Sequence, residues 1–192
     1  PHSSDVVSVV HNGIIENSDE LKKELESKGL NFKSQTDTEV ITILITEALK
    51  KMTPLNAVFQ TLQKLKGSFA LGIIFKSHRD IIIGARRGSP LAVGYSKEEN
   101  YLGSDSYALK SMTNKISYLD DGDLCILSKD KVEFYDFEQK KGKWYCVLFH
   151  QLHCVLPSAE LCNLFFLTFC APRSNSLEGV LEWQILDLGH LP

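Results

Sequence analysis

The sequence predicts an α+β fold in which helices and strands are segregated along the chain and pack as a layered sandwich. Two observations indicate this class. Three consecutive segments between residues 18 and 65 carry the apolar spacing of amphipathic helices, while β-branched and apolar runs lie at the start of the chain and between residues 69 and 135. A doubly wound parallel sheet would require strands and helices to alternate, and this chain does not alternate them.

The chain begins with a β-strand signal. Residues 6–10 contain four valines, and residues 11–13 read His-Asn-Gly before the isoleucine pair at 14–15. Valine favours strands because its branched side chain fits a pleated surface. Asn-Gly is the strongest short signal for a two-residue hairpin turn. We therefore expect a buried strand, a tight turn at Asn12 and Gly13, and a short return strand.

Three helices are expected next. The first begins at Asn17, which with Glu20 three residues later resembles a capping box, and it ends at Gly29. The second follows the sequence Thr-Asp-Thr-Glu at 36–39, where side chains can cap the helix and complement its dipole, and it stops near Pro54. The third continues with apolar residues three and four apart until residue 65.

The remaining pattern is β-rich. Residues 69–75 and 80–85 are two apolar runs separated by a polar tip, so they predict a pair of central strands. Shorter strands, separated by turns rich in Gly, Pro and Asp, are expected at 91–95, 101–103, 115–119, 123–127 and 132–135.

Composition excludes several classes of protein. The chain has 192 residues, a formal net charge of -3 and a sequence pI near 6.1, so it has no basic field with which to hold a nucleic acid. Hydrophobic residues make up 43% of the chain, which supports a sizeable core and excludes a disordered protein. We therefore expect no nucleic-acid partner.

Composition changes abruptly near residue 143. Residues 144–192 hold four of the five cysteines and five of the 45 charged residues, so the cysteines are not a framework for the whole chain. The apolar run at 161–171 is shorter than the roughly 18 to 20 residues of a membrane span, and we expect no membrane association. Cysteines near histidines allow a metal site, but without a Cys-x-x-Cys pair we favour cysteines with no common function. Residues 138–192 are expected to form a low-charge tail that is not a domain.

Three short motifs could carry chemistry, and each has a structural alternative. Asn12 beside Gly13 could supply two hydrogen-bond donors to an oxyanion, or could form the hairpin turn. Asp37 could hold the ammonium group of a substrate, or could cap the second helix. Arg86 and Arg87 could bind an anion, or could lie on a solvated edge or in an ion pair. Taken one at a time, the motifs do not decide between these alternatives.

Five motifs follow one another in a recognisable order. They are VVHNGIIEN at 9–17, TDTEV at 36–40, RRGSPL at 86–91, the turn at 104–105 with sequence Ser-Asp, and LDDGD at 119–123. Together they resemble the glutaminase domain of the glucosamine-6-phosphate synthase family over roughly residues 1–137. This family, also called glutamine-fructose-6-phosphate aminotransferase (isomerizing), belongs to the class II glutamine amidotransferases. The set is far more specific than any one motif, because all five fall at suitable intervals.

The resemblance implies a fold and a site. The implied fold is the four-layer αββα sandwich of the N-terminal-nucleophile hydrolases, here incomplete. Asn12 and the backbone N–H of Gly13 would form the oxyanion hole for the tetrahedral intermediate at the glutamine side-chain amide, and Asp37 would bind the substrate α-ammonium. Glutamine would be hydrolysed to glutamate, and its ammonia would serve glucosamine 6-phosphate synthesis. No organic cofactor or metal is expected for this hydrolysis.

The resemblance also implies parts that this chain lacks. The family's nucleophile is a cysteine at the mature N-terminus, and Pro1 cannot replace it. Cys125 falls in a late strand and the other cysteines follow the matched region, so none is expected to substitute. The isomerase domains that bind fructose 6-phosphate would follow residue 137. We therefore expect a fragment truncated at both ends and inactive by itself, taken from a cytoplasmic enzyme that forms homo-oligomers.

Two alternatives stay open at this point. Amidophosphoribosyltransferase and asparagine synthetase also pair an Asn-Gly oxyanion element with a downstream acid, although TDTEV and RRGSPL favour the sugar synthase. A hypothesis of a different class is a non-catalytic fragment that survives because it binds a partner subunit. The missing nucleophile supports this second alternative.

Overall fold

The computed structural model describes residues 1–141, 147–148 and 169–170. Side chains are described for the first of these ranges. The cysteines of the tail, and the metal site considered for them, lie outside the described side chains. None of the helices in the described ranges is long and apolar enough to cross a membrane.

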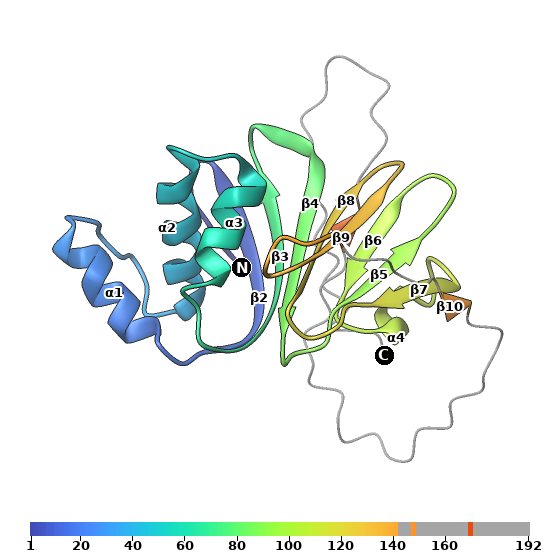
Figure 1. The fold of residues 1–192 in the computed structure, drawn as a ribbon, viewed down its shortest axis with the longest axis horizontal. Coiled ribbons are helices and arrows are strands. Elements are labelled where there is room, and N and C mark those ends of the chain that lie inside the picture. Colours follow the sequence, from blue (N-terminus) through green and yellow to red (C-terminus); the bar gives the residue numbers. More distant parts are fainter. Residues whose placement is uncertain (142–146, 149–168, 171–192) are drawn as a thin grey trace, which may run out of the picture.

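Helices lie on one face of a six-stranded antiparallel sheet, and the first of them packs against the outer side of the second (Figure 1). The helices are α1 (Ser18–Ser27), α2 (Asp37–Leu49) and α3 (Pro54–Leu62). The strand order is β1-β2-β3-β4-β8-β9, with bounds His2–Ser3, Val7–Ile15, Gly67–Phe75, His78–Arg87, Asp123–Ser128 and Val132–Asp136. Helix α2 contacts β1 and β2, so its residues lie near the β1 and β2 end of this sheet.

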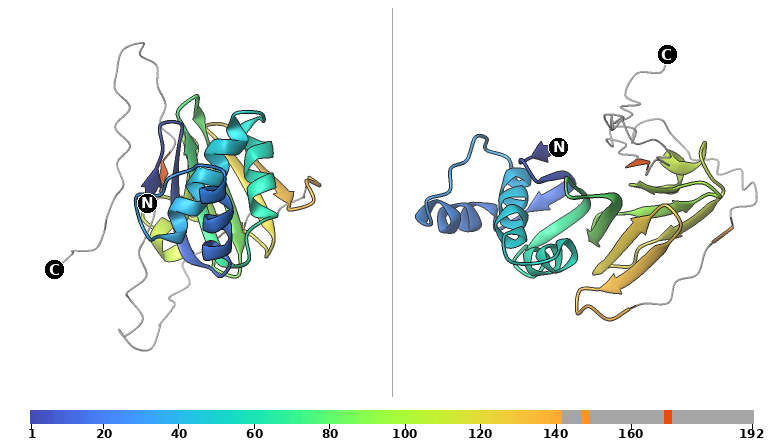
Figure 2. Two further views of the ribbon diagram at one scale, coloured as in Figure 1. Left: turned by 90° about the vertical axis from the view of Figure 1, so that its left-hand side faces the viewer. Right: turned by 90° about the horizontal axis from the view of Figure 1, so that it is seen from above.

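A second antiparallel sheet lies on the other face of the first (Figure 2). Its strand order is β10-β7-β5-β6-β11, with bounds Val147–Leu148, Lys115–Tyr118, Ala92–Tyr95, Asn100–Gly103 and Phe169–Cys170. The short helix α4 (Ser106–Leu109) contacts β5 and β6.

Three apolar cores separate the four layers. Each core is represented by two buried residues: Ile41 and Leu71 between helices and six-stranded sheet, Ile82 and Val93 between the sheets, and Leu109 and Ile116 between the second sheet and α4. The order helix, sheet, sheet, helix confirms the predicted αββα sandwich. The layer beyond the second sheet consists of α4 in the described residues, so the sandwich is incomplete there.

The hairpin predicted at Asn12 and Gly13 is wrong. Strand β2 runs straight through both residues, and all nine of its residues pair with β3, from Val7 opposite Phe75 to Ile15 opposite Gly67. Gly13 has a φ of 130°, in the range that L side chains rarely adopt. A Cβ built on it would lie 2.1 Å from the carbonyl oxygen of Ser68. A glycine is therefore required here because β3 approaches closely, and not because the chain turns.

The capping box predicted at Asn17 is also wrong, although Asn17 does occupy the N-cap of α1. Its side chain makes no cap hydrogen bond. Instead its Nδ2 donates to the carbonyl of Lys64 at 2.9 Å, and its Oδ1 accepts from the N–H of Lys66 at 2.9 Å. Asn17 thus ties the start of α1 to the segment that leads into β3.

The other predicted strands and helices are present with small shifts of their ends. The predicted pairing of two central strands is confirmed, because β3 and β4 are antiparallel neighbours. The third helix ends at Leu62 and not at residue 65. The two-residue strand β1 and the four-residue helix α4 were not predicted, because elements this short carry too few residues to show a period.

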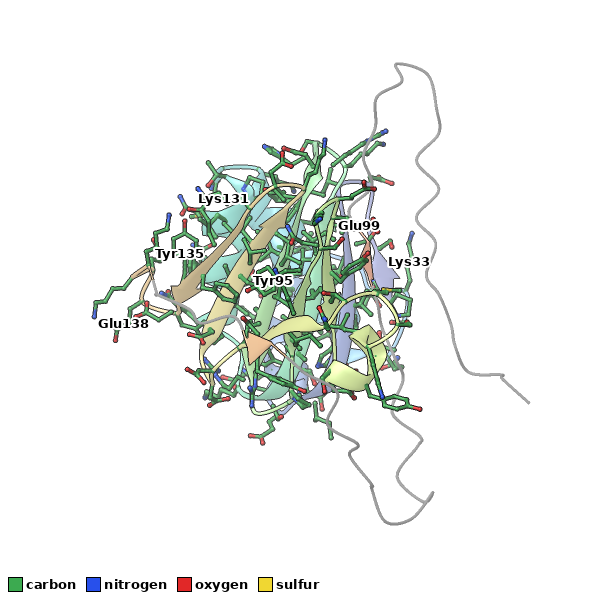
Figure 3. The ribbon with its side chains drawn as sticks, turned by 90° about the vertical axis from the view of Figure 1, so that its right-hand side faces the viewer. Lys33, Tyr95, Glu99, Lys131, Tyr135 and Glu138 are labelled. Carbon is green, nitrogen blue, oxygen red and sulfur yellow. The ribbon has the colours of Figure 1, made fainter. Side chains whose placement is uncertain are left out.

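Strand β9 forms the outer edge of the six-stranded sheet, and Figure 3 shows Tyr135 on it, with Lys131 just before its start and Glu138 beyond its end. The ring of Tyr135 meets Phe59 of α3 edge-on, with centroids 6.2 Å apart. This contact joins the far edge of the sheet to the helical layer.

Truncation of Phe59 tests the core between the helices and the sheet. Phe59 is 1% exposed, so Phe59→Ala should lower the free energy of unfolding by roughly 3 to 5 kcal/mol through lost burial and the remaining cavity. Urea unfolding followed by circular dichroism measures the change. Met52→Ala, at an exposed site, should change it by about 0.5 kcal/mol or less. Equal losses in the two variants would contradict the assigned core.

Candidate functional site

Strand β2 presents its residues to two different layers. Val9 belongs to the core beneath the helices, whereas Val10 belongs to the core between the two sheets. Side chains alternate along a strand, so His11 points toward the helices and Asn12 toward the second sheet. The contact of His11 with Thr38 of α2 agrees with this direction. The His-Asn-Gly motif therefore contributes to both faces of the sheet.

The edge of β2 that faces away from β3 is open beyond β1 in the described part of the chain. Strand β1 pairs with Ser8 and Val9 and reaches no further along β2. The N–H of Ile15 points to this open edge, where it donates to Oδ2 of Asp37 at 3.0 Å. Backbone N–H groups alternate in direction along a strand, so the N–H of Gly13 points to the same edge. The Gly13 N–H therefore lies on the same edge as the Asp37 carboxylate, two residues before the Ile15 N–H that binds it.

Asp37 is the first residue of α2, but its carboxylate bonds to β2 and does not cap the helix. The N-cap is Thr36, whose side chain makes no cap hydrogen bond. The cap alternative for Asp37 is therefore corrected, since the carboxylate satisfies an edge amide of the sheet. Its side chain is 25% exposed. A carboxylate has about four lone-pair sites, so Asp37 can accept further donors from a ligand.

His11 is the buried neighbour of this carboxylate. Its side chain is 2% exposed, and its Nδ1 lies 3.4 Å from Oδ1 of Asp37 and 3.3 Å from Oγ1 of Thr38. Burial lowers the pKa of His11 below its ordinary value, and the Asp37 carboxylate opposes part of that shift. The sequence analysis assigned no role to His11. Strand alternation could have found it, because His11 is two residues from the buried Val9 on the same face.

Glu39 holds the loop that precedes α2. Its carboxylate accepts hydrogen bonds from the N–H of Lys33 at 2.7 Å, the N–H of Ser34 at 2.6 Å and the hydroxyl of Ser34 at 2.7 Å. Burial acts to raise the pKa of Glu39, but these hydrogen bonds and the nearby ring of His2 hold the pKa below its ordinary value. Glu39 therefore fixes the approach of the chain to Asp37, a role that the sequence analysis missed.

Asn12 and Gly13 offer hydrogen-bond donors at consecutive positions of β2. Asn12 is half-buried, and its carboxamide has no hydrogen-bond partner among the residues that the structure describes. Gly13 is exposed and carries no side chain that would cover its N–H. A side-chain amide and a backbone N–H that reach the same carbonyl oxygen can stabilise an oxyanion.

Arg86 and Arg87 are engaged within the fold and do not lie free on a solvated edge. A guanidinium nitrogen of Arg86 donates to the carbonyl of Leu119. The guanidinium of Arg87 lies 5.3 Å from the ring centre of Phe69 and 5.1 Å from that of Phe137. Both side chains therefore bind the end of β4 to neighbouring segments, and their contacts do not favour an anion site.

The family described as the glutamine amidotransferase domain matches residues 2–111, which is more than half of the chain. This chain belongs to the glutamine amidotransferase domain family. Asn12, Gly13 and Asp37 all fall within the matched residues.

Curated relatives of this amidotransferase domain carry the name glutamine-fructose-6-phosphate aminotransferase (isomerizing). The protein of Mesorhizobium japonicum is 51% identical over 142 residues, which are 73% of this chain and 23% of the relative. The protein of Zymomonas mobilis is 50% identical over 141 residues, again 73% of this chain and 23% of the relative. The chain therefore spans about a quarter of the length of these relatives, and the sequence resemblance to their family is confirmed.

Solved structures share the fold. Glutamine phosphoribosylpyrophosphate amidotransferase from B. subtilis, in complex with ADP and GMP, aligns with a TM-score of 0.61 and 25% identity over 73% of this chain and 31% of its own. The structure of the allosteric regulatory enzyme of purine biosynthesis aligns with a TM-score of 0.60 and 25% identity over 71% of this chain and 30% of its own. These neighbours support the N-terminal-nucleophile hydrolase fold for this amidotransferase domain.

The pKa of His11 reports on the contact with Asp37. Since burial lowers this pKa and the Asp37 carboxylate raises it, Asp37→Asn should lower the His11 pKa further. An NMR titration of the His11 ring in both proteins measures the two values. A His11 pKa that rises, or stays unchanged, in Asp37→Asn would show that the two groups do not interact.

The Glu39 carboxylate should make stability depend on pH. Because its pKa is lower in the folded protein, its contribution is present above the unfolded value near 4.5 and is lost as the pH falls through the folded value. Glu39→Gln removes the charge and places an NH2 group, itself a donor, next to two backbone N–H donors. It should lower the free energy of unfolding by about 1 to 3 kcal/mol at pH 7 and by less at pH 4. Urea unfolding at both pH values tests this, with the exposed Glu20→Gln as the control. A loss that does not depend on pH would contradict the role of the Glu39 charge.

Proposed function

We propose that this domain forms the oxyanion hole and the ammonium site of a glutaminase. Asn12 and the N–H of Gly13 stabilise the oxyanion that develops at the glutamine side-chain amide, and Asp37 binds the α-ammonium group. The observation that carries this proposal is the hydrogen bond from Ile15 N–H to Asp37, which sets the carboxylate on the same strand edge as the Gly13 amide.

The spacing of these groups suits glutamine. Two residues along a strand span about 6.8 Å, and this is the step from Gly13 to the residue that anchors Asp37. In glutamine, four bonds of about 1.5 Å separate the α-amino nitrogen from the side-chain amide carbon, so the two atoms lie about 5 Å apart when extended. Hydrogen bonds at both ends can span the difference. The substrate would therefore lie along the open edge of β2.

The nucleophile is proposed to come from a segment upstream of Pro1, as an N-terminal cysteine. Its thiol sulfur bonds to the amide carbon of glutamine, and the electron pair of the carbonyl moves to the oxygen held by Asn12 and Gly13. The thiol proton passes through the cysteine amine to the leaving nitrogen, and ammonia departs. Water then cleaves the thioester to release glutamate and restore the thiol. Cys125 cannot take this role, because it is fully buried and burial raises the pKa of its thiol above its ordinary value, which disfavours the thiolate.

The complete protein is proposed to use the ammonia as a glutamine-fructose-6-phosphate aminotransferase. Relatives of that name at about 50% identity support this proposal over the phosphoribosylpyrophosphate alternative, whose structures are 25% identical. On this proposal residues 1–137 are the partial glutaminase domain, residues 138–192 are an unrelated tail, and fructose 6-phosphate binds in domains outside this chain. A cytoplasmic enzyme of hexosamine synthesis that forms homo-oligomers is the setting we propose.

The experiment is a glutaminase assay on this chain and on the same chain extended by its natural upstream segment, called the extended chain below. We expect glutamate release from the extended chain, and none above a protein-free control from this chain. Activity in neither protein would favour the non-catalytic fragment. Activity in this chain would contradict the upstream nucleophile.

Substitutions in the extended chain assign the roles. Asn12→Ala should lower kcat by roughly 100- to 1,000-fold, as loss of one oxyanion donor does. Asp37→Ala should raise KM for glutamine by at least roughly tenfold, which is about 1.4 kcal/mol of binding. Matched controls are Asn56→Ala and Asp19→Ala, both exposed residues on helices, and both should leave kcat and KM unchanged. Unchanged constants in Asn12→Ala or Asp37→Ala would contradict the corresponding assignment.

A further inference from the structure

We propose that Ser68, held from the other side by the turn at Gly88 and Ser89, positions the Gly13 amide at the site. These are positioning residues and not catalytic residues, and their role rests on the proposed function. The geometry that points to it is a stack of close backbone contacts that runs from the RRGSPL segment through Ser68 to Gly13.

The first contact joins Ser68 to Gly13. A Cβ built on Gly13 would lie 2.1 Å from the Ser68 carbonyl oxygen and 2.9 Å from the Cα of Phe69. The first distance is far below the closest approach of a real Cβ atom and the second is just below it, and both partners are backbone atoms. Ser68 is also the residue opposite Ile14 in the β2 and β3 pairing. A displacement of Ser68 therefore displaces the backbone of Gly13.

The second contact joins Ser68 to the turn after β4. Gly88 has a φ of 75°, and a Cβ built on it would lie 2.4 Å from the Ser68 hydroxyl oxygen and 2.9 Å from the Ser68 Cβ. The Ser68 and Ser89 hydroxyl oxygens are 3.0 Å apart, within hydrogen-bond distance. Ser68 thus lies between two glycines, and each lacks the side chain that would push it away.

The turn itself is fixed by the segment at 119–123. The N–H of Gly88 donates to a carboxylate oxygen of Asp121, and the N–H of Gly122 donates to the carbonyl of Arg86 at 3.1 Å. The guanidinium of Arg86 donates back to the carbonyl of Leu119. These bonds hold Gly88 against Ser68 from a third segment of the chain.

This arrangement accounts for two motifs that the proposed chemistry does not use directly. RRGSPL supplies Gly88 and Ser89, and LDDGD supplies the carboxylate and the backbone groups that hold them. An oxyanion donor acts at full strength when its N–H is held in place before the reaction, and small misplacements can cost roughly 100-fold in rate. The stack of contacts supplies that rigidity on the side of Gly13 opposite the open edge.

The first test is the backbone amide resonance of Gly13 in 1H–15N NMR spectra of this chain. Gly88→Ala should move this resonance, because its new Cβ displaces Ser68. Gly29→Ala is the matched control, since Gly29 has a similar φ of 83° and a Cβ there would meet no atom within 4 Å. Ser68→Ala, which adds no atom, should also move the Gly13 resonance and serves if Gly88→Ala does not fold. An unmoved resonance in a folded variant overturns the proposal.

The second test is kinetic and uses the extended chain. Gly88→Ala should lower kcat by roughly 10- to 100-fold with KM for glutamine nearly unchanged, because Asp37 is left in place. Replacing Ser68 by Gly as well removes the clashing atoms and should restore part of kcat. The positioning role is overturned if Gly88→Ala lowers kcat no more than Gly29→Ala does. It is also overturned if the double variant has the same kcat as Gly88→Ala. If kcat is unchanged in Asn12→Ala as well as in Gly88→Ala, the proposed oxyanion hole itself is wrong.

Discussion

The hydrogen bond from the Ile15 N–H to the Asp37 carboxylate joins the first residue of α2 to the open edge of β2. Without it the candidate site would be two unrelated pieces, a strand and a helix end. The bond is charge-assisted and partly shielded from water, so it is stronger than an exposed surface contact. Glu39 holds the loop in front of the helix, and His11 packs behind the carboxylate. The rest of the domain maintains this junction of helix and strand.

The candidate site lies on the part of the β2 edge that the short strand β1 leaves unpaired. Where β1 ends, the backbone donors of β2 lose a strand partner in the described part of the chain, and Asp37 takes one of them. A protein usually covers or blocks such an edge, because unpaired strands promote association. Here the edge carries the Asp37 carboxylate and the N–H of the exposed Gly13, and the half-buried Asn12 precedes Gly13 on the face toward the second sheet. These are the groups that binding an amino acid with a side-chain amide would require.

Much of the fold could be predicted from the sequence, because apolar periodicity in α2, β3 and β4 is set by which faces are buried. The roles of Gly13, Asn17 and Asp37 could not, and the hairpin and helix caps predicted at these residues are wrong. Their local signals are sound for an isolated segment, but the side chains and the glycine are used in tertiary contacts with Lys64, Ile15 and Ser68. The proposed site residues Asn12, Gly13 and Asp37 were predicted from the resemblance of five ordered motifs. His11, Glu39 and Ser68 were missed because their contacts cross between elements.

In the proposed complex, glutamine lies along the open edge of β2 between the Asn12 and Gly13 donors and the Asp37 carboxylate. A crystal structure of the extended chain with bound glutamate would show this placement. We expect the α-ammonium within hydrogen-bond distance of Asp37, and the side-chain carboxylate directed at Asn12 and the N–H of Gly13, with donor distances of about 2.7 to 3.1 Å. A glutamate bound in the reverse direction, or bound away from this edge, would contradict it.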